Sequence, residues 1–267
     1  VRRAELARAD FLANASHELR TPLTSIVGFI ETMQGPAKDD PAAQVRFLEI
    51  MRAQAERMRR LIADLMSLSR IELNEHRHPS AIEDLGLVVR EVVDSLAPVA
   101  AARAITLKLD LPGPDPIPVV AVRDELAQIA QNLIDNAIKY SPHGGVIEIA
   151  ICGQLEAGEA SDQASRQWPG APRVSVVAPQ RGLPTRYGVL RVRDHGQGIP
   201  REHLPRLAER FYRVEAGRDG PARGTGLGLA IVKHIVARHR GGFGVESQLG
   251  EGSGFGIWLP QSAADGD

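Results

Sequence analysis

The chain has 267 residues, of which 43% are hydrophobic, so it can form one large domain or two modest ones with real cores. The 32 Lys and Arg balance 33 Asp and Glu, and this formal charge of -1 gives no reason to expect nucleic acid or an anionic membrane as a partner. The single cysteine, Cys152, excludes an intrachain disulfide and a cysteine-based metal cluster. No stretch approaches the roughly 18 apolar residues of a membrane span, and the first residues lack a signal peptide's apolar core. We therefore expect a soluble chain.

Two amphipathic helices are predicted at the start of the chain. The first covers about residues 4 to 34, and its apolar stripe contains Leu12, Ala15, Leu19, Leu23, Ile26, Ile30 and Met33. The segment 35 to 41, GPAKDDP, ends it. The second stripe alternates steps of three and four, through Leu48, Met51, Ala55, Met58, Ile62, Leu65 and Ser69. These helices predict an antiparallel hairpin, and because a lone hairpin leaves half of each stripe wet, we expect a homodimer that forms a four-helix bundle.

After residues 74 to 79 the pattern changes to short strands and helices, which indicates a domain boundary between residues 1 to 76 and 77 to 267. Helices are predicted at about 85 to 102, 124 to 140 and 227 to 239, and strands at 106 to 109, 146 to 151, 189 to 193, 243 to 247 and 254 to 259. These elements predict an α/β sandwich. The segment 153 to 188 is long for a strand connection, so we interpret it as a dispensable insertion remote from the chemistry, although Val174 to Ala178 could pair as an added edge strand.

His17 is placed on the water-facing side of the first helix, and Thr21 lies one turn later on the same face. An exposed histidine alone is usually a solvated surface residue. Glu18 changes this interpretation, because its carboxylate can orient the imidazole and accept its proton, which leaves the other ring nitrogen free to attack a phosphoryl group.

Three segments of the second domain point to a nucleotide. The sequence QNLIDNAIKY places Asn132, Asn136 and Lys139 on one polar helix face, although a solvated face remains open for Asn132 alone. The sequence VRDHGQGIP ends a strand with Asp194, whose carboxylate can accept from adenine's amino group, and its glycines can let a flat ligand approach. The sequence GTGLGLAIV from residue 224 begins a helix whose free amides can hold phosphate oxygens.

Residues 200 to 226 lack apolar periodicity and are interpreted as a mobile lid over the nucleotide. Arg210 and Arg213 are candidates to meet the γ-phosphate. For Phe211, packing at the base of the lid is at least as good an interpretation as ligand contact.

The sequence FLANASHELRTPLTSI resembles the phospho-acceptor motif of bacterial two-component sensor histidine kinases, and the order of the later motifs extends the resemblance over nearly the whole chain. The resemblance implies a dimerising helical hairpin followed by an α/β ATP-binding domain of the histidine kinase, Hsp90 and gyrase type. It implies that His17 is the phospho-acceptor, Glu18 its general base, and Thr21 the residue that positions water for dephosphorylating a response regulator.

The same resemblance implies ATP and Mg²⁺ as cofactors, with Asn136 as the Mg²⁺ ligand and Lys139 and Tyr140 on the phosphate and ribose side. The expected nucleotide-binding residues are Asn132, Asn136, Lys139, Tyr140, Asp194, Gly196, Gly198, Ile199, Arg210, Phe211, Arg213, Gly224, Thr225, Gly226, Leu227, Gly228 and Leu229. A response regulator receiver domain is the expected partner. The segments ETMQGPAKDD and LSRIE look like the phosphate-regulon branch, and kinases of this type are normally anchored in the inner membrane by an upstream sensor region that these residues lack.

Two other functions compete with this prediction. Chaperone, gyrase and mismatch-repair ATPases of the same superfamily place a catalytic Glu one turn before the Mg²⁺ ligand. Here that position is Asn132, which cannot take a proton from water, so transfer to His17 is favoured over hydrolysis. A scaffold that binds nucleotide without transferring phosphate is disfavoured, because the set of His17, Glu18, Asn136, Asp194 and glycines is complete.

Overall fold

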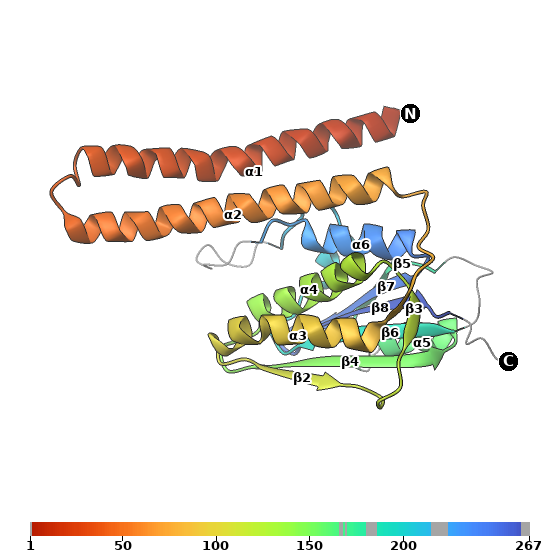
Figure 1. The fold of residues 1–267 in the computed structure, drawn as a ribbon. Helices are drawn as coiled ribbons and strands as arrows, with labels where there is room; N and C mark the ends of the chain where they lie inside the picture. Colours follow the sequence, from red (N-terminus) through yellow and green to blue (C-terminus); the bar gives the residue numbers. More distant parts are fainter. Residues whose placement is uncertain (1, 166–167, 169, 180–185, 215–223, 263–267) are drawn as a thin grey trace.

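The computed structural model describes residues 2–165, 168, 170–179, 186–214 and 224–262, and their side chains from residue 11 onward with the exception of Ser165. Two antiparallel helices, α1 (Arg2–Gln34) and α2 (Pro41–Leu73), form the predicted hairpin (Figure 1). Helix α2 begins where the sequence dictates: Asp40 accepts a hydrogen bond from the amide of Ala43 at 3.0 Å, and Pro41 needs no amide partner in the first turn. Within the described ranges, no helix is both long enough and apolar enough to cross a membrane.

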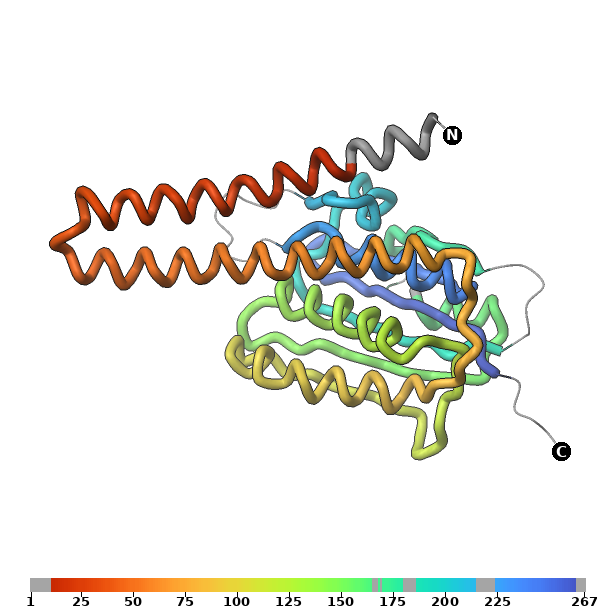
Figure 2. Tube along the Cα trace, turned by 45° about the horizontal axis from the view of Figure 1, so that its top comes forward, coloured from red at the N-terminus to blue at the C-terminus, as the bar shows by residue number. Residues whose placement is uncertain are grey.

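Helix α2 has a second apolar face that the sequence analysis missed. Leu61, Leu68 and Ile71 are buried against the core of the following α/β region, and the second half of α2 lies alongside α6 (Figure 2). The predicted stripe behaves differently, since Leu48 and Ile62 remain 53% and 48% exposed in the single chain. One side of α2 therefore docks on the α/β region and another side stays available.

The α/β region is built on a six-stranded sheet in the order β2-β4-β6-β8-β7-β5, in which only the β2–β4 pair is parallel. A separate two-stranded ladder, β1–β3, was not predicted. The bounds of these elements are β1 Ile82–Asp84, α3 Leu85–Ala101, β2 Thr106–Asp110, β3 Pro118–Val120, α4 Arg123–Tyr140, β4 Val146–Leu155, α5 Ala157–Ser165, β5 Arg173–Val177, β6 Tyr187–Asp194, the 3-10 helix η1 Arg201–Arg206, α6 Gly228–Arg238, β7 Gly242–Gln248 and β8 Gly252–Pro260.

Helices α3, α4 and α6 cover one face of this sheet and enclose the main core (Figure 1). Alternation along β4 supplies Ile147, Ile149 and Ile151 to that face, while the residues between them are only half-buried. Every helix and strand predicted outside the segment 153–188 is present within a few residues, and a helical hairpin followed by an α/β sandwich is confirmed.

The described part of the segment 153–188 packs on and extends the sheet, which was not expected of an insertion. Helix α5 packs on the opposite face of the sheet, where Ala160 and Ala164 are fully buried against Tyr187, Val189 and Trp258. Strand β5 pairs with β7, so the alternative of an added edge strand is correct. The approach of α5 is close: a Cβ on Gly256 of β8 would lie 2.0 Å from the carbonyl oxygen of Ala164. These buried contacts argue against the prediction that this segment could be removed with little loss of stability.

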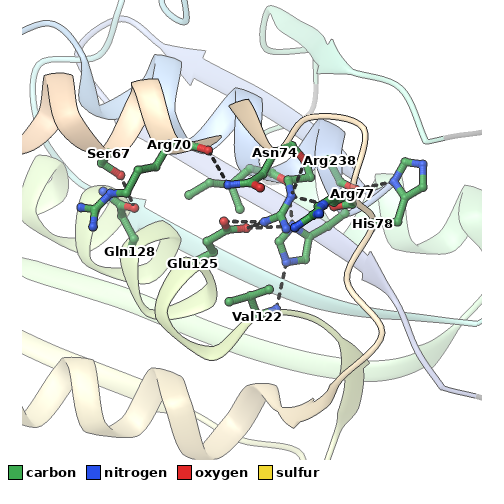
Figure 3. A network of polar contacts seen from close by, with 11 residues as sticks. Ser67, Arg70, Asn74, Arg77, His78, Val122, Glu125, Gln128 and Arg238 are labelled. Atoms are coloured by element: carbon green, nitrogen blue, oxygen red, sulfur yellow. Dashed lines mark hydrogen bonds and ion pairs between the residues drawn. The ribbon is translucent and has the colours of Figure 1, made fainter. Parts of the chain in front are cut away.

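The end of α2 is fastened to the α/β region through Arg238 (Figure 3). Its Nε donates to the carbonyl oxygens of Asn74 at 3.1 Å and Arg77 at 2.8 Å, and its Nη1 donates to Glu125 at 2.5 Å. Two turns further back, the Ser67 hydroxyl donates to Gln128 of α4 at 2.8 Å. These contacts hold α2 over the N-terminal half of α4, and the candidate site lies further along α4, toward its C-terminal end.

Candidate functional site

A cavity of about 510 Å³ lies between α2, α4, the end of β6 and the start of α6, within the size range of small-molecule sites. Most of the predicted nucleotide residues converge on it from segments far apart in the chain. Those that line the cavity are Asn132, Asn136, Lys139, Tyr140, Asp194, Gly198, Ile199, Arg213, Gly224, Thr225, Gly226, Gly228 and Leu229. The structure thus brings the Asn-bearing helix, the Asp-Gly strand end and the Gly-rich helix start together.

Helix α4 presents its predicted polar face to this cavity. Asn132, Asn136 and Lys139 line the wall, while Leu133 and Ala137 are buried on the other side of the helix. Lys139 forms an ion pair with Asp135 at 2.5 Å, which restrains the ammonium group beside the cavity. The amide oxygen of Asn136 is a hard oxygen donor of the kind that Mg²⁺ prefers, so this wall fits a metal-bound polyphosphate.

Asp194 lies at the floor of the cavity and is only 3% exposed. Its Oδ1 accepts from the amides of Gly196 at 2.9 Å and Ser253 at 3.3 Å, which fixes the carboxylate at the strand end. Burial raises the pKa of Asp194, and these two amide hydrogen bonds partly oppose that rise. A carboxylate fixed in this way can recognise a donor on a flat ligand such as adenine.

The glycines after Asp194 serve protein packing as well as the cavity. Gly198 has a φ of +73°, and a Cβ there would lie 2.2 Å from the carbonyl oxygen of Gln248. Gly196 does not line the cavity, and a Cβ on it would lie 2.5 Å from the carbonyl oxygen of Tyr140. The expectation that both glycines admit a ligand is therefore incomplete, because each admits a neighbouring backbone segment.

The Gly-rich start of α6 also faces the cavity. Leu227 precedes the helix without a side-chain cap and is itself buried in the core and not on the cavity wall. The Thr225 hydroxyl accepts from the amide of Leu227 at 3.3 Å and donates to Asp64 of α2 at 2.6 Å. Desolvation raises the pKa of Asp64, while the Thr225 hydroxyl partly offsets that rise. An uncapped helix N-terminus supplies free amides and a favourable dipole for phosphate.

One wall of the cavity was not anticipated. Helix α2 contributes Arg57, Arg60, Asp64 and Ser67 at helical steps of three and four, together with Arg59, Ala63 and Arg70. This polar stripe, running beside the predicted apolar seam, was the signal that could have found the wall. The cavity is lined by the cations Arg57, Arg59, Arg60, Arg70, Lys139 and Arg213 and by the acids Asp64, Asp135 and Asp194, so its lining is basic although the whole chain is near neutral.

His17 lies outside this cavity. It lines a smaller cavity of about 290 Å³ together with Asn14, Glu18, and residues of the segment Arg206 to Tyr212. As predicted, His17 is exposed, and the Thr21 hydroxyl one turn later donates to the His17 carbonyl oxygen at 3.2 Å. The carboxylate of Glu18 accepts from Arg57 of α2 at 2.8 Å, and no described hydrogen bond joins it to His17.

The base of the predicted lid contacts the hairpin. Phe211 packs against Phe11 of α1 with ring centroids 5.8 Å apart, and it does not line the larger cavity. Arg210 pairs with Glu72 of α2 and lies over the ring of Phe11, so it too is held away from the larger cavity, where a γ-phosphate contact had been predicted. Residues 215–223 of the predicted lid lie outside the described residues.

Comparisons with known families agree with this geometry. Residues 7–74 match the model of the His Kinase A (phospho-acceptor) domain, which covers the hairpin. Residues 121–263 match the model of the histidine kinase-, DNA gyrase B-, and HSP90-like ATPases, which covers the cavity-forming part of the sheet region.

Individual proteins give the same picture. The chain is 37% identical over 261 residues to the phosphate regulon sensor protein PhoR of Pseudomonas aeruginosa, covering 96% of this chain and 50% of that protein. It is 34% identical over 262 residues to the sensor protein kinase WalK of Staphylococcus haemolyticus, covering 98% of this chain and 38% of that protein. The chain therefore spans half or less of the length of these curated relatives.

Solved structures confirm the fold. The Acinetobacter baumannii histidine kinase AdeS superposes with a TM-score of 0.60 at 24% identity, covering 92% of this chain and 98% of that one. The histidine kinase ThkA, solved in complex with the response regulator protein TrrA, gives a TM-score of 0.67 at 20% identity, covering 98% of this chain and 64% of that one. The chain belongs to the histidine kinase-, DNA gyrase B- and HSP90-like ATPase family, and its phospho-acceptor hairpin places it among the histidine kinases.

Proposed function

We propose that this chain is the catalytic core of a sensor histidine kinase, which transfers the γ-phosphoryl group of ATP to His17. The observation that carries the proposal is the convergence of Asn136, Asp194 and the Gly-rich start of α6 on one basic cavity. The proposal divides the chain into a dimerising and phospho-accepting hairpin, residues 1 to 76, and an ATP-binding domain, residues 77 to 267.

In the proposed reaction, a ring nitrogen of His17 attacks the γ-phosphorus of ATP. A nitrogen–phosphorus bond forms as the bond to the β-phosphate oxygen breaks, ADP leaves, and the imidazole proton passes to Glu18. Mg²⁺ held by Asn136 would neutralise the developing charge on the phosphates. Because His17 and Asn136 line different cavities of this chain, transfer requires either a change in the relative position of the hairpin and the ATP-binding domain or an acceptor histidine from the second copy of the dimer.

The expected fate of the phosphoryl group is an aspartate on a response regulator. The complex of ThkA with a response regulator protein supports this partner, and the phospho-acceptor domain match supports a homodimer. Relatives named as sensor proteins, of which this chain spans half or less, support a further sensing region in the whole protein. An inner-membrane anchor, with the residues described here on its cytoplasmic side, is the part of the proposal that rests on the family resemblance alone.

The kinase step is tested by incubating the chain with γ-labelled ATP and Mg²⁺. The label should be acid-labile and alkali-stable, as a phosphoramidate is, and His17→Gln should abolish it while ATP binding is retained. Undiminished labelling of His17→Gln would overturn the assignment of the acceptor.

Thr21 is proposed to act only in dephosphorylating the regulator, since its hydroxyl lies one helical turn from His17 on the exposed face. Thr21→Ala should label normally but fail to dephosphorylate a phosphorylated regulator. A parallel loss of both activities would instead indicate damage to α1.

A further inference from the structure

Arg57 connects the two cavities. Its side chain lines the larger cavity, in which we place the nucleotide, beside Asn136 and Lys139. Its Nη2 also donates to Glu18 Oε2 at 2.8 Å, and Glu18 lines the smaller cavity with His17. Arg57 of α2 therefore lines the nucleotide cavity and pairs with the carboxylate next to the phospho-acceptor.

The ion pair with Arg57 engages one carboxylate oxygen of Glu18. The side chains of Arg57 and Glu18 are 19% and 30% exposed, whereas the neighbouring pair of Arg59 and Glu56 on the same helix is 73% and 47% exposed. The carboxylate oxygen Oε2 of Glu18 is already engaged by the guanidinium of Arg57, so proton transfer from the imidazole to that oxygen requires the ion pair to open. A second anion that takes Arg57 away would release Oε2 for this role.

We propose that Arg57 is a positioning residue that exchanges the carboxylate of Glu18 for the terminal phosphate of the bound triphosphate. The inference rests on the proposed function, because it requires ATP in the larger cavity and proton transfer to Glu18. A planar guanidinium can bind phosphate oxygens in a bidentate manner, and its charge suits a phosphoryl group in transfer. The exchange frees Glu18 only when a γ-phosphate is present.

This exchange orders the steps of the reaction. When the nitrogen–phosphorus bond to His17 forms and ADP leaves, the proton released by the imidazole meets a carboxylate that is no longer paired. Arg57 gains and loses no atoms, and its charge stays beside the phosphoryl group. ADP lacks the terminal phosphate, so it leaves Arg57 on Glu18.

The binding test compares ADP with a non-hydrolysable ATP analogue, each with Mg²⁺, by calorimetry on the full chain. In Arg57→Gln the affinity for the analogue should fall about tenfold while the affinity for ADP is unchanged, as expected for the loss of one charge-assisted contact. Arg57→Lys retains the charge and should recover part of the preference for the analogue.

Arg59→Gln is the matched control. It removes the same charge from the same helix and the same cavity wall, but Arg59 pairs with Glu56 and not with Glu18. This variant should keep the wild-type ratio of analogue to ADP affinity. An equal effect of both substitutions would mean that only the general charge of the cavity matters, and the inference would be wrong.

The exchange itself has a spectroscopic signature. The carboxylate carbon signal of Glu18, assigned with Glu18→Gln, should change when the analogue is added to the wild-type chain and should not change with ADP. A Glu18 signal that is insensitive to the analogue would show that Arg57 merely ties α1 to α2. A wild-type chain that neither binds the analogue nor labels His17 would contradict the proposed function itself, which separates the two failures.

Discussion

Asn136 illustrates how a single side chain supports the assignment of the site. Its amide lines the larger cavity on the same wall as Lys139, and an amide oxygen is a suitable ligand for Mg²⁺. In Asn136→Ala, nucleotide affinity should lose most of its dependence on Mg²⁺, while affinity measured without Mg²⁺ should be nearly unchanged. Titrations with and without the metal check this, and an equal Mg²⁺ effect in both proteins would contradict the role.

His239 is a buried residue whose protonation opposes folding. Its Nε2 accepts from the Val122 amide at 3.2 Å and its Nδ1 contacts the Ile235 carbonyl oxygen at 2.8 Å, which requires the neutral ring with the proton on Nδ1. Desolvation lowers the pKa of His239 from 6.5 to about 4, even though Glu125 lies 3.7 Å away. The neutral ring therefore stabilises the fold fully above pH 6.5, and this contribution is lost as the pH falls toward 4.

The expected consequence is that the free energy of unfolding falls by about 3 kcal/mol between pH 6.5 and 4 through this one group. His239→Gln keeps an acceptor for the Val122 amide but does not titrate, so its unfolding curve should lack this decline. His76→Gln, at an exposed position, is the control and should retain it. Denaturant unfolding across the pH range measures the difference, and identical pH slopes for all three proteins would refute the assignment.

At the scale of single elements, α5 covers part of the sheet face that lies opposite the main core. Most of the outer face of β8 is glycine, and α5 presents alanines to it, so small residues on both sides allow helix and strand to approach closely. The segment is therefore structural, while its position on the face opposite the three large helices keeps it away from the candidate site.

Gly256→Ala tests this packing. The new Cβ would lie 2.0 Å from the Ala164 carbonyl oxygen, so α5 must shift, and we expect a loss of about 1–3 kcal/mol in the free energy of unfolding. Gly158→Ala, within α5, has nothing within 4 Å of the added atom and should be neutral or stabilising. ATP affinity at a temperature where both variants are folded should match the wild type, and a weakened affinity for Gly256→Ala would show that α5 influences the nucleotide site.

The elements that the sequence predicted well are those with a sustained period. The long helices and the central strands carry clear periodicity of 3.6 or 2, whereas β1 and β3 have three residues each, too few to show alternation. Helix α5 was missed because its buried residues are Ala160 and Ala164, which carry almost no hydrophobic signal. The nucleotide motifs on α4, β6 and α6 could be named from the sequence, and most of their residues lie together as expected. The polar stripe on α2 was also visible in the sequence, but only the docking of α2 on the α/β region places it on the cavity.

For the whole molecule, the hairpin exposes an apolar surface in the single chain. Leu12, Leu23, Val27 and Ile30 of α1 are at least 38% exposed, and Leu48 of α2 is 53% exposed. A patch of this kind marks an interface, and a four-helix bundle with a second copy would cover it. We expect Leu23→Glu to convert a dimer into monomers, with sedimentation as the measurement.

Arg20→Glu provides the comparison, because it places a carboxylate nearby on the same helix at an exposed polar position. This variant should remain dimeric. Monomers in both variants would point to a general effect of charge, and dimers in both would mean that the apolar face of α1 is covered in another way.

Because α2 contributes a basic wall to the larger cavity, this cavity is formed jointly by the helical hairpin and the α/β region. A ligand that binds between them changes the equilibrium constant for docking of the hairpin on the α/β region. By thermodynamic linkage, docking changes the ligand's affinity by the same factor. A movement imposed on the hairpin from upstream would therefore be felt as a change in nucleotide affinity, and filling the cavity would stiffen the hairpin in return. Hairpin movement and nucleotide binding would then be linked by a single coupling free energy.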